Sequence, residues 1–234
     1  MRAVILAGGK GTRLRPYTTI LPKPLVPMGD RPILEIIIRQ LAKHGFKRID
    51  LIVGHLGGLI KVYLDGIELP EGLELHYFWE DQPLGTAGAL RQIEDLDENF
   101  LAMNGDVLTT LDFAQLLRFH TGQGAALTIA THRQMVDLEL GVIESKDGVV
   151  TGYIEKPTLP FDVSMGVYAY SPSVLSDIPL SYFDFPQLVN ALLEKGETVA
   201  VYTGPGMWFD IGTVSEHERA TAEVTTHPEL FGDA

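Results

Sequence analysis

The chain has 234 residues, of which 45% are hydrophobic and 21% are charged, so it can bury one sizeable core. It has no cysteine, which excludes disulfides, thiolate metal sites and a cysteine nucleophile. Its formal net charge is -13 at pH 7, whereas a general nucleic-acid-binding protein has a basic surface. The apolar run near the start, residues 3–7, is too short for a signal peptide or a membrane span. We therefore expect a cytoplasmic protein that binds neither nucleic acid nor membrane.

The first half of the chain predicts alternating strands and helices. Strands are expected at residues 2–7, 48–53, 73–79, 100–103 and 125–131, where apolar residues run continuously or alternate. One helix is expected after Asp30 as its N-cap, ending at His44-Gly45, and others at residues 59–64, 86–94 and 111–120. This alternation predicts an α/β fold with a mostly parallel, doubly wound sheet.

The second half predicts a more mixed arrangement. Segments 141–144 and 149–155 flank a hairpin-like turn at Lys146-Asp147-Gly148. Thr213 and Glu216 form a capping box that opens a last helix, and the residues after Val224 are expected to be loose. The remaining elements are strands at 164–170, 198–202 and 207–209, and helices at 172–176 and 185–195.

Charge is distributed unevenly along the chain. Residues 1–29 contain five basic residues and no acidic one, and the remainder has 13 basic against 31 acidic residues. The five are Arg2, Lys10, Arg13, Arg15 and Lys23. Any one of them alone is best explained as solvated surface charge. As a cluster within glycine and proline, they indicate a site for a small anionic ligand.

The loop after the first strand, Gly8-Gly9-Lys10-Gly11, has the composition of a phosphate-binding loop. Glycine lets backbone N–H groups approach an anion. Neither of the two common patterns is present, however. There is no G-x-x-x-x-G-K-[ST], and the spacing G-x-G-x-x-G fails after Gly11, which disfavours a dinucleotide-dependent oxidoreductase. On spacing alone, a phosphate site and an ordinary tight turn both stay open.

Longer motifs extend from this loop through nearly the whole chain. LAGGKGTRL at 6–14 is followed by Pro16 and by PKPLVP at 22–27. PLGTAGAL stands at 83–90, NGD at 104–106, EKP at 155–157, GVY at 166–168 and WFDIG at 208–212. This set resembles the signature of the sugar-nucleotide pyrophosphorylases, which join a sugar 1-phosphate to a nucleoside triphosphate. The sequence looks most similar to the mannose-1-phosphate guanylyltransferases.

The resemblance implies a Rossmann-like nucleotidyltransferase fold in a single domain, residues 1–224, followed by a tail at 225–234. The nucleotide-binding part would cover about residues 1–135, and a smaller sugar-binding β/α part about 136–224. Members of the family often carry a C-terminal left-handed β-helix, and we expect none in this chain.

The implied reaction is attack by the sugar phosphate on the α-phosphorus of GTP, with mannose 1-phosphate or a related sugar 1-phosphate. UTP, CTP or dTTP with another sugar 1-phosphate are alternatives, and a homo-oligomer is left open. A non-catalytic subunit that senses sugar nucleotides is a competing class. It is disfavoured because Arg13, Lys23, Asp106 and Asp210 are all present.

For the nucleotide, the resemblance implies that Arg13 contacts the leaving pyrophosphate and Lys23 the reacting phosphates. Glu80 would read the base, because an ionised carboxylate accepts hydrogen bonds from the adjacent N1–H and N2–H donors of guanine. Gln82 is the alternative reader. The full nucleotide-binding set is Leu6, Ala7, Gly8, Gly9, Gly11, Thr12, Arg13, Glu80, Gly85 and Thr86.

For metal, the resemblance implies Mg²⁺ on Asp106 and Asp210. Mg²⁺ prefers hard oxygen ligands. Asp106 follows an apolar strand, at the end where open parallel sheets bind ligands. Asp210 is not needed as a helix cap, because Thr213 already caps the next helix. With Arg13, Lys23 and Lys156, these two aspartates complete the predicted catalytic set.

For the sugar phosphate, the resemblance implies that Lys156 holds the phosphate and Glu155 a sugar hydroxyl. Two positions depart from the family pattern: Leu140 stands where an aromatic residue is usual, and Ser164 where asparagine is usual. The identity of the sugar therefore stays open. The full sugar-phosphate set is Asn104, Gly141, Glu155, Lys156 and Ser164.

Overall fold

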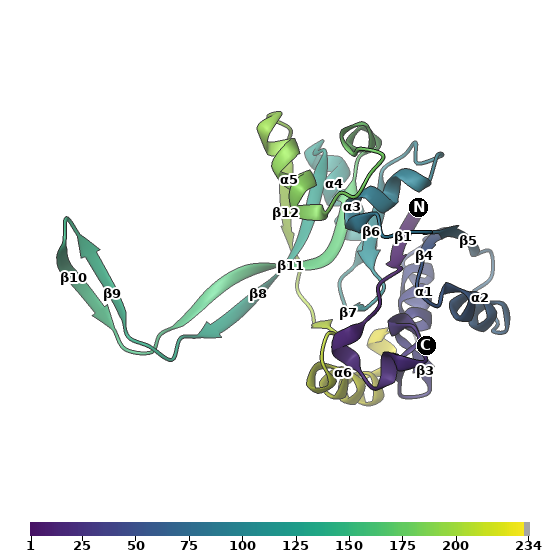
Figure 1. Cartoon of the computed structure of the whole chain (residues 1–234), viewed down its shortest axis with the longest axis horizontal. Coiled ribbons are helices and arrows are strands. Elements are labelled where there is room, and N and C mark those ends of the chain that lie inside the picture. Colours follow the sequence, from purple (N-terminus) through teal and green to yellow (C-terminus); the bar gives the residue numbers. More distant parts are fainter. Residues whose placement is uncertain (232–234) are drawn as a thin grey trace.

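A seven-stranded sheet runs through the computed structural model, which describes residues 1–231 (Figure 1). Its strand order is β12-β8-β11-β6-β1-β4-β5, and the pairings are parallel apart from the two made by β11. The predicted mostly parallel α/β fold is thus confirmed. The strands are β1 (Arg2–Ala7), β4 (Arg48–Val53), β5 (Glu74–Trp79), β6 (Phe100–Asn104), β8 (Leu127–Asp137), β11 (Thr158–Tyr170) and β12 (Val199–Thr203).

Helices cover both faces of this sheet. In β1, Ala3 and Ile5 belong to one buried cluster, and Val4 between them belongs to the other. A strand buried on both faces needs apolar residues at successive positions, which explains the continuous runs in β1, β4 and β6. The first cluster includes residues of α1 (Ile33–Lys43), α2 (Gly57–Asp65), α4 (Phe113–Gln123) and α6 (Val214–Thr226). The second includes residues of α3 (Gly85–Gly88), the 3-10 helix Ala89–Gln92 and α5 (Phe185–Glu194).

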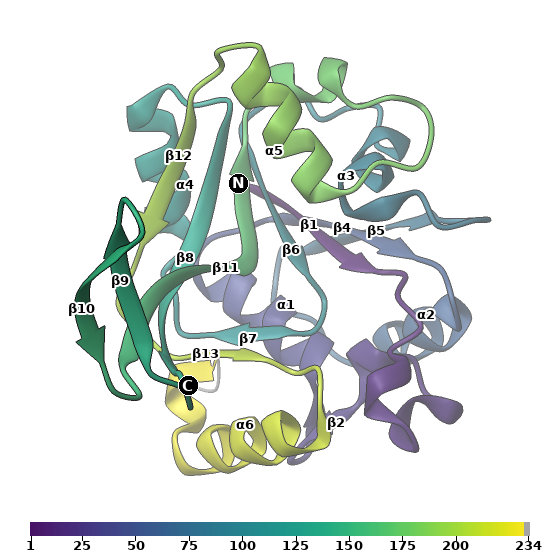
Figure 2. The same cartoon turned by 60° about the vertical axis from the view of Figure 1, so that its left-hand side comes forward.

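A small antiparallel pair of strands connects distant parts of the chain. β7 (Val107–Thr109) follows β6 directly, and it pairs with β13 (Trp208–Asp210), which lies between it and α6 (Figure 2). The register places Asp210 opposite Val107. The structure therefore brings the NGD and WFDIG segments together. β7 was not predicted from the sequence.

Several predicted boundaries change. The predicted N-cap at Asp30 is wrong: α1 follows Pro32, because residues 27–32 form a short hairpin of β2 (Pro27–Met28) and β3 (Arg31–Pro32) with Gly29 in its turn. The helix predicted at 86–94 is α3 followed by a 3-10 helix that ends at Gln92. Residues 172–176 also lie in a 3-10 helix, Pro172–Asp177.

The end of the described chain is packed rather than loose. α6 runs to Thr226, and a further 3-10 helix, Pro228–Phe231, buries Phe231 in the core. The predicted capping box of Thr213 and Glu216 is confirmed. Residues 232–234 of the predicted tail lie outside the described residues. Residues 1–231 contain no β-helix and no helix with the length and apolar character to cross a bilayer.

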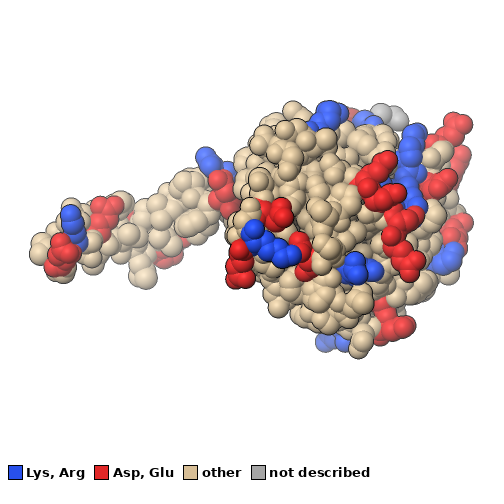
Figure 3. Space-filling view, turned by 90° about the horizontal axis from the view of Figure 1, so that it is seen from above, with Lys and Arg blue, Asp and Glu red and all other residues tan. Residues whose placement is uncertain are grey.

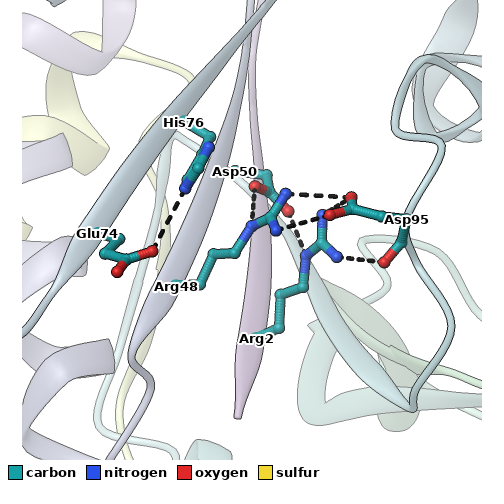
Figure 4. A network of polar contacts seen from close by, with 6 residues as sticks. All are labelled: Arg2, Arg48, Asp50, Glu74, His76 and Asp95. Carbon is teal, nitrogen blue, oxygen red and sulfur yellow. Dashed lines mark hydrogen bonds and ion pairs between the residues drawn. The ribbon is translucent and has the colours of Figure 1, made fainter.

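Paired charges lie at the end of the sheet where β1 and β4 begin (Figure 4). Arg2 and Arg48 are neighbours in register, and both bind the fully buried carboxylate of Asp50, at 2.5 and 3.0 Å. Both also bind the exposed Asp95, at 2.7 Å. Hydrogen bonds from Arg48 and then Arg2 lower the pKa of Asp95 to about 2. A buried charge is tolerated when it is paired in this way.

A two-stranded ribbon projects from the sheet (Figures 1 and 3). β8 and β11 continue past the pair Thr131–Ser164 as far as the pair Asp137–Thr158. The hairpin of β9 (Val142–Lys146) and β10 (Val149–Ile154) forms the tip. The hairpin is confirmed, whereas the predicted strands stop short of the ribbon. We call residues 132–163 the arm and the remaining described residues the body.

Candidate active site

A cavity of about 800 Å³ opens at the carboxyl ends of β1, β4, β5 and β6. This edge is where open parallel sheets bind ligands. The arginine–aspartate pairs lie at the opposite end of the strands, because Arg2 begins β1 whereas the glycine loop follows Ala7 at its carboxyl end. Ten of the predicted site residues line the cavity: Leu6, Ala7, Gly8, Gly9, Lys23, Glu80, Gly85, Thr86, Asn104 and Asp106.

The glycine loop leaves no room for side chains at two positions. A Cβ on Gly8 would lie 2.3 Å from Oε2 of Glu80. Gly11 has a φ of +58°, and a Cβ there would lie 2.8 Å from Cβ of Lys23. Gly9 faces open space and lines the cavity together with Gly8 and Lys10. The loop therefore exposes backbone to the cavity, as a phosphate-binding loop requires.

Lys23 and Asp106 form an ion pair inside the cavity. Lys23 belongs to the 3-10 helix Lys23–Leu25 and is only 8% exposed, and Asp106 follows β6. A lysine this buried needs a partner charge, because leaving it unpaired would cost several kcal/mol, on the order of 3–5. The pair places one cation and one anion where the NGD segment meets the cavity.

Asp210 lies close enough to this pair for both of its charges to shift the Asp210 pKa. The pairing of β13 with β7 is extended by a hydrogen bond from the Ile211 N–H to the Asp106 carbonyl, at 3.1 Å. Burial raises the pKa of Asp210, the charge of Asp106 adds to this rise, and the charge of Lys23 opposes it. Asp210 itself does not line the cavity.

The two aspartates fit a magnesium ion. Within residues 1–231 there is no cluster of three or more histidine or acidic side chains that could hold a metal unaided. Mg²⁺ is commonly held by one or two carboxylates, with substrate phosphates and waters completing its shell. Asp106 in the cavity lining and Asp210 on the strand that pairs beside it match that donor set.

Arg13 and Thr12 stand beside the cavity rather than in its lining. They belong to the 3-10 helix Thr12–Leu14, and both side chains are exposed. A Cβ built on Gly212 would lie 3.4 Å from the Arg13 guanidinium, so Arg13 adjoins the segment that carries Asp210. The charge of Arg13 also acts to lower the pKa of Asp210.

Glu80 and the Gly85-Thr86 turn form another wall. Oε1 of Glu80 accepts a hydrogen bond from the Leu84 N–H at 3.1 Å, whereas Oε2 lies beside Gly8. Burial raises the pKa of Glu80, and the Leu84 N–H opposes that rise. Gly85 has a φ of +80°, and a Cβ there would lie 2.6 Å from the Phe183 carbonyl oxygen. Gln82, the alternative base reader, lines the cavity as well.

The loop before α5 supplies lining residues that sequence reasoning missed. The hydroxyl of Tyr182 donates a hydrogen bond to Asp184 at 2.5 Å, and Asp184 accepts another from the Thr86 N–H at 3.3 Å. In sequence, Asp184 precedes Pro186 and Gln187 and has the pattern of a helix cap, which it also is. No local sequence signal therefore shows that this cap residue also lines the cavity. His55, at the end of β4, was missed as well.

Three predicted sugar-phosphate residues are on the arm and outside the cavity. Glu155 accepts a hydrogen bond from the Tyr153 hydroxyl at 2.7 Å, and a Cβ on Gly141 would collide with the same tyrosine. The side chain of Lys156 is 59% exposed, with its Nζ 3.9 Å from Glu139. The structure therefore does not bring these residues to their own chain's cavity.

The other two sugar-phosphate residues lie nearer to the cavity. Asn104 lines it, and the Asn104 amide packs against Gly166 of β11. Ser164 is at the root of the arm, where its hydroxyl donates to the Tyr168 hydroxyl at 3.2 Å.

Comparisons with known proteins agree on a family. A model of the nucleotidyl transferase family matches residues 2–227. A UTP–glucose-1-phosphate uridylyltransferase from Synechocystis sp. is 32% identical, covering 94% of this chain and 62% of its own length. A mannose-1-phosphate guanylyltransferase catalytic subunit beta from Xenopus tropicalis is also 32% identical, covering 91% and 61%. The chain thus spans about three fifths of the length of these curated relatives.

A solved structure of similar size supports the same fold. HddC from Yersinia pseudotuberculosis superimposes with a TM-score of 0.74 at 25% identity, covering 95% of this chain and 98% of its own. The same protein has also been solved in complex with GMP-PN.

Proposed function

The chain belongs to the nucleotidyl transferase family, and on that premise we propose that it transfers a nucleoside monophosphate from a nucleoside triphosphate to a sugar 1-phosphate. One observation carries the proposal. The glycine loop, the Lys23–Asp106 pair and Asp210 converge at the carboxyl edge of the sheet. Exposed loop backbone, cations and two carboxylates are together what a reaction between two phosphate groups requires.

The reaction asks little covalent work of the protein. A phosphate monoester has a second pKa of about 6, so its oxygen is already largely ionised at neutral pH and no general base is needed. That oxygen attacks the α-phosphorus of the triphosphate. The bond from the α-phosphorus to the oxygen that bridges to the β-phosphorus breaks, and pyrophosphate leaves. The obstacle is bringing two polyanions together.

The cations of the body would reduce the repulsion between the two negatively charged substrates. In the proposed complex, the Lys23 ammonium exchanges its Asp106 partner for the reacting phosphates. Arg13 faces the departing pyrophosphate. Its planar guanidinium can donate two parallel hydrogen bonds to the pyrophosphate oxygens, whereas a lysine ammonium would act as a point charge. Gly8 to Gly11 present backbone N–H groups to the nucleotide phosphates.

Asp106 and Asp210 would hold the Mg²⁺ ion. When bound, the ion supplies charge neutralisation on the phosphate oxygens. Either carboxylate is costly to bury next to the other without a cation, which is consistent with the raised pKa of Asp210.

We further propose GTP as the nucleotide and mannose 1-phosphate or a related sugar 1-phosphate as the acceptor. Glu80 offers guanine one carboxylate oxygen, Oε2, that the Leu84 N–H does not use. The names of the guanylyltransferase relative and the GMP-PN complex of HddC support the same choice. UTP is the main alternative, because the Synechocystis uridylyltransferase is as similar to this chain as the guanylyltransferase is.

A panel assay tests the proposal. Pyrophosphate release is measured for GTP, UTP, CTP and dTTP, each with glucose, mannose and related sugar 1-phosphates. We expect Mg²⁺-dependent release with one nucleotide favoured, and that nucleotide to be GTP. A wide preference for UTP or dTTP would contradict the base assignment. Binding of sugar nucleotides without release from any pair would instead support the non-catalytic sensing class.

A further inference from the structure

For its length, the arm exposes more apolar side chains than the rest of the molecule does. Nine of the twenty large hydrophobic residues that are exposed in the described chain lie between residues 135 and 161. Leu140 is 78% exposed, and Ile143, Tyr153 and Val149 are each at least 60% exposed. A two-stranded ribbon is marginally stable alone in water, and clustered exposed apolar residues mark an interaction site. The arm therefore requires a surface to pack against.

The arm also carries its polar residues away from its own cavity. Between Ser164 and Thr158, six residues of ribbon carry the chain roughly 20 Å outward at about 3.3 Å per residue. Figure 1 shows the ribbon leaving the body, and Figure 3 shows it standing clear when seen from above. Lys156, just beyond this ribbon, has a φ of +42°, so the backbone bends where the hairpin meets it.

Charge indicates which surface the tip fits. Residues 137–158 contain five acidic and two basic residues. The body is acidic overall, so most of its surface would repel them, but Lys10, Arg13 and Arg15 are exposed in and just after the glycine loop, and residues 1–29 contain no acidic residue. Complementary charge of this kind orients two surfaces and suppresses wrong pairings. The tip is therefore matched to the glycine-loop region of a body like its own.

Exposed apolar residues in or next to the segments that line the cavity match the apolar side chains of the arm. Tyr182 lines the cavity and is still 56% exposed, and Leu180 before it is 82% exposed. Ile20, between the glycine loop and Lys23, is 74% exposed. The body thus presents an apolar and basic rim to a partner that is apolar and acidic.

We propose that two copies of this chain exchange arms, so that the arm of each copy covers the cavity of the other and the site is complete only in the dimer. This inference deepens the proposed function and rests on it: the partner's Lys156 and Glu155 would supply the sugar-phosphate contacts that each cavity lacks. Reciprocal exchange gives a closed two-fold dimer in which the same contact occurs twice.

Mixing two inactive variants tests the exchange. Arg13→Ala damages the body and Lys156→Ala damages the arm, and both side chains are exposed, so both variants should fold. Each alone should have little activity. After co-expression or joint refolding, random pairing places an intact body beside an intact arm in one site of each mixed dimer, which restores about a quarter of wild-type turnover. A mixture no more active than its components shows that the arm acts on its own body, and overturns the exchange. Normal activity of Lys156→Ala alone overturns it too.

A matched mixture controls for other causes of recovery. Arg13→Ala combined with Asp106→Asn places both defects in the body, so no pairing can rebuild an intact site. This mixture should stay inactive. Recovery in it would show that activity returns without arm exchange, and would count against the proposal.

The assembly itself is measured independently of activity, which separates failure of this inference from failure of the proposed function. Asp137 and Thr158 face each other in register, so an Asn-Gly turn can join them and remove the tip. By sedimentation, the full chain should be a dimer and the shortened chain a monomer with an unchanged melting temperature. A monomeric full chain, or a shortened chain that still dimerises, would overturn the exchange even if catalysis is as proposed.

Discussion

The body and the arm share the two long strands β8 and β11 but are stabilised differently. Inside the body, β11 pairs with both β6 and β8 at residues 168–170, and helices cover both faces of the sheet. In the arm, residues 158–163 of the same strand pair with β8 alone, and most of their side chains are exposed. One continuous strand therefore passes from a buried environment to an exposed one.

This difference separates two kinds of site residue. Lys23 and Asp106 are held by the fold, since their positions follow from buried elements and from each other. Glu155 and Lys156 are held only relative to the arm. The body can therefore preorganise the nucleotide and metal side of the reaction by itself, whereas the sugar side depends on where the arm docks.

Removing both aspartates should produce the largest effect and would test whether the body holds the chemistry. Asp106→Asn and Asp210→Asn each keep the size of the side chain and remove a negative ligand. Each should raise the Mg²⁺ concentration needed for half-maximal rate, and the double variant should lose about 10³-fold or more in kcat. Initial rates across a Mg²⁺ titration measure this, with the exposed Asp97→Asn as a control. An unchanged Mg²⁺ dependence in Asp210→Asn would remove that residue from the site.

Truncating the arm lysine should have the next largest effect and would sharpen the division between the two regions. Lys156→Ala should lower kcat/KM for the sugar 1-phosphate by about 10²-fold, the scale of one lost charge-assisted contact, and leave KM for the nucleotide nearly unchanged. Lys146→Ala, on the same hairpin, is the matched control and should behave as wild type. Equal losses in both variants would mean that the arm acts through its overall charge.

Changing Glu80 tests whether the body alone selects the base. Glu80→Gln keeps the shape of the side chain but replaces one acceptor oxygen with a donor, so preference for GTP over UTP should fall by about 10-fold. The ratio of kcat/KM values for the two nucleotides measures it. Gln82→Ala is the companion variant: if it shifts the preference and Glu80→Gln does not, the alternative reader is the correct one.

Asp95 tests the body's stability far from the cavity, with a small expected effect. Its folded pKa of about 2 is below the ordinary value, so its charge stabilises the fold above the unfolded pKa, and this contribution is lost as pH falls toward 2. Asp95→Asn should lower the melting temperature slightly at pH 7, because the carboxylate is largely solvated. The difference from wild type should shrink below about pH 4. A constant difference across that range would point to a cause other than charge.

Much of the body could be predicted from the sequence because its signals are local. Continuous apolar runs identified β1, β4 and β6, and the capping box of Thr213 and Glu216 identified the start of α6. The cap at Asp30 failed because the hairpin of β2 and β3 competes for the same residues. β7 was missed because three residues carry too little periodicity to distinguish a strand from a loop.

The sequence predicted individual residues of the site but not how these residues contact one another. Motif resemblance selected Lys23 and Asp106, but their ion pair depends on contacts between segments 83 positions apart. Tyr182 and Asp184 could not be selected, since their sequence pattern indicates only a helix start. The same motif logic grouped Lys156 with the cavity, and no local pattern encodes the direction in which β8 and β11 leave the sheet.

The irregularity between Ser164 and Tyr168 gives the molecule a mechanical property. There the register of β11 against β8 shifts, Gly166 adopts a φ of +72°, and the strand loses β6 as its second neighbour. A ribbon in which each strand has a single neighbour is held by fewer hydrogen bonds than a sheet, so we expect bending of the arm to be concentrated at this point. Gly166 packs against Asn104 in the cavity wall, so such bending would occur directly beside the site.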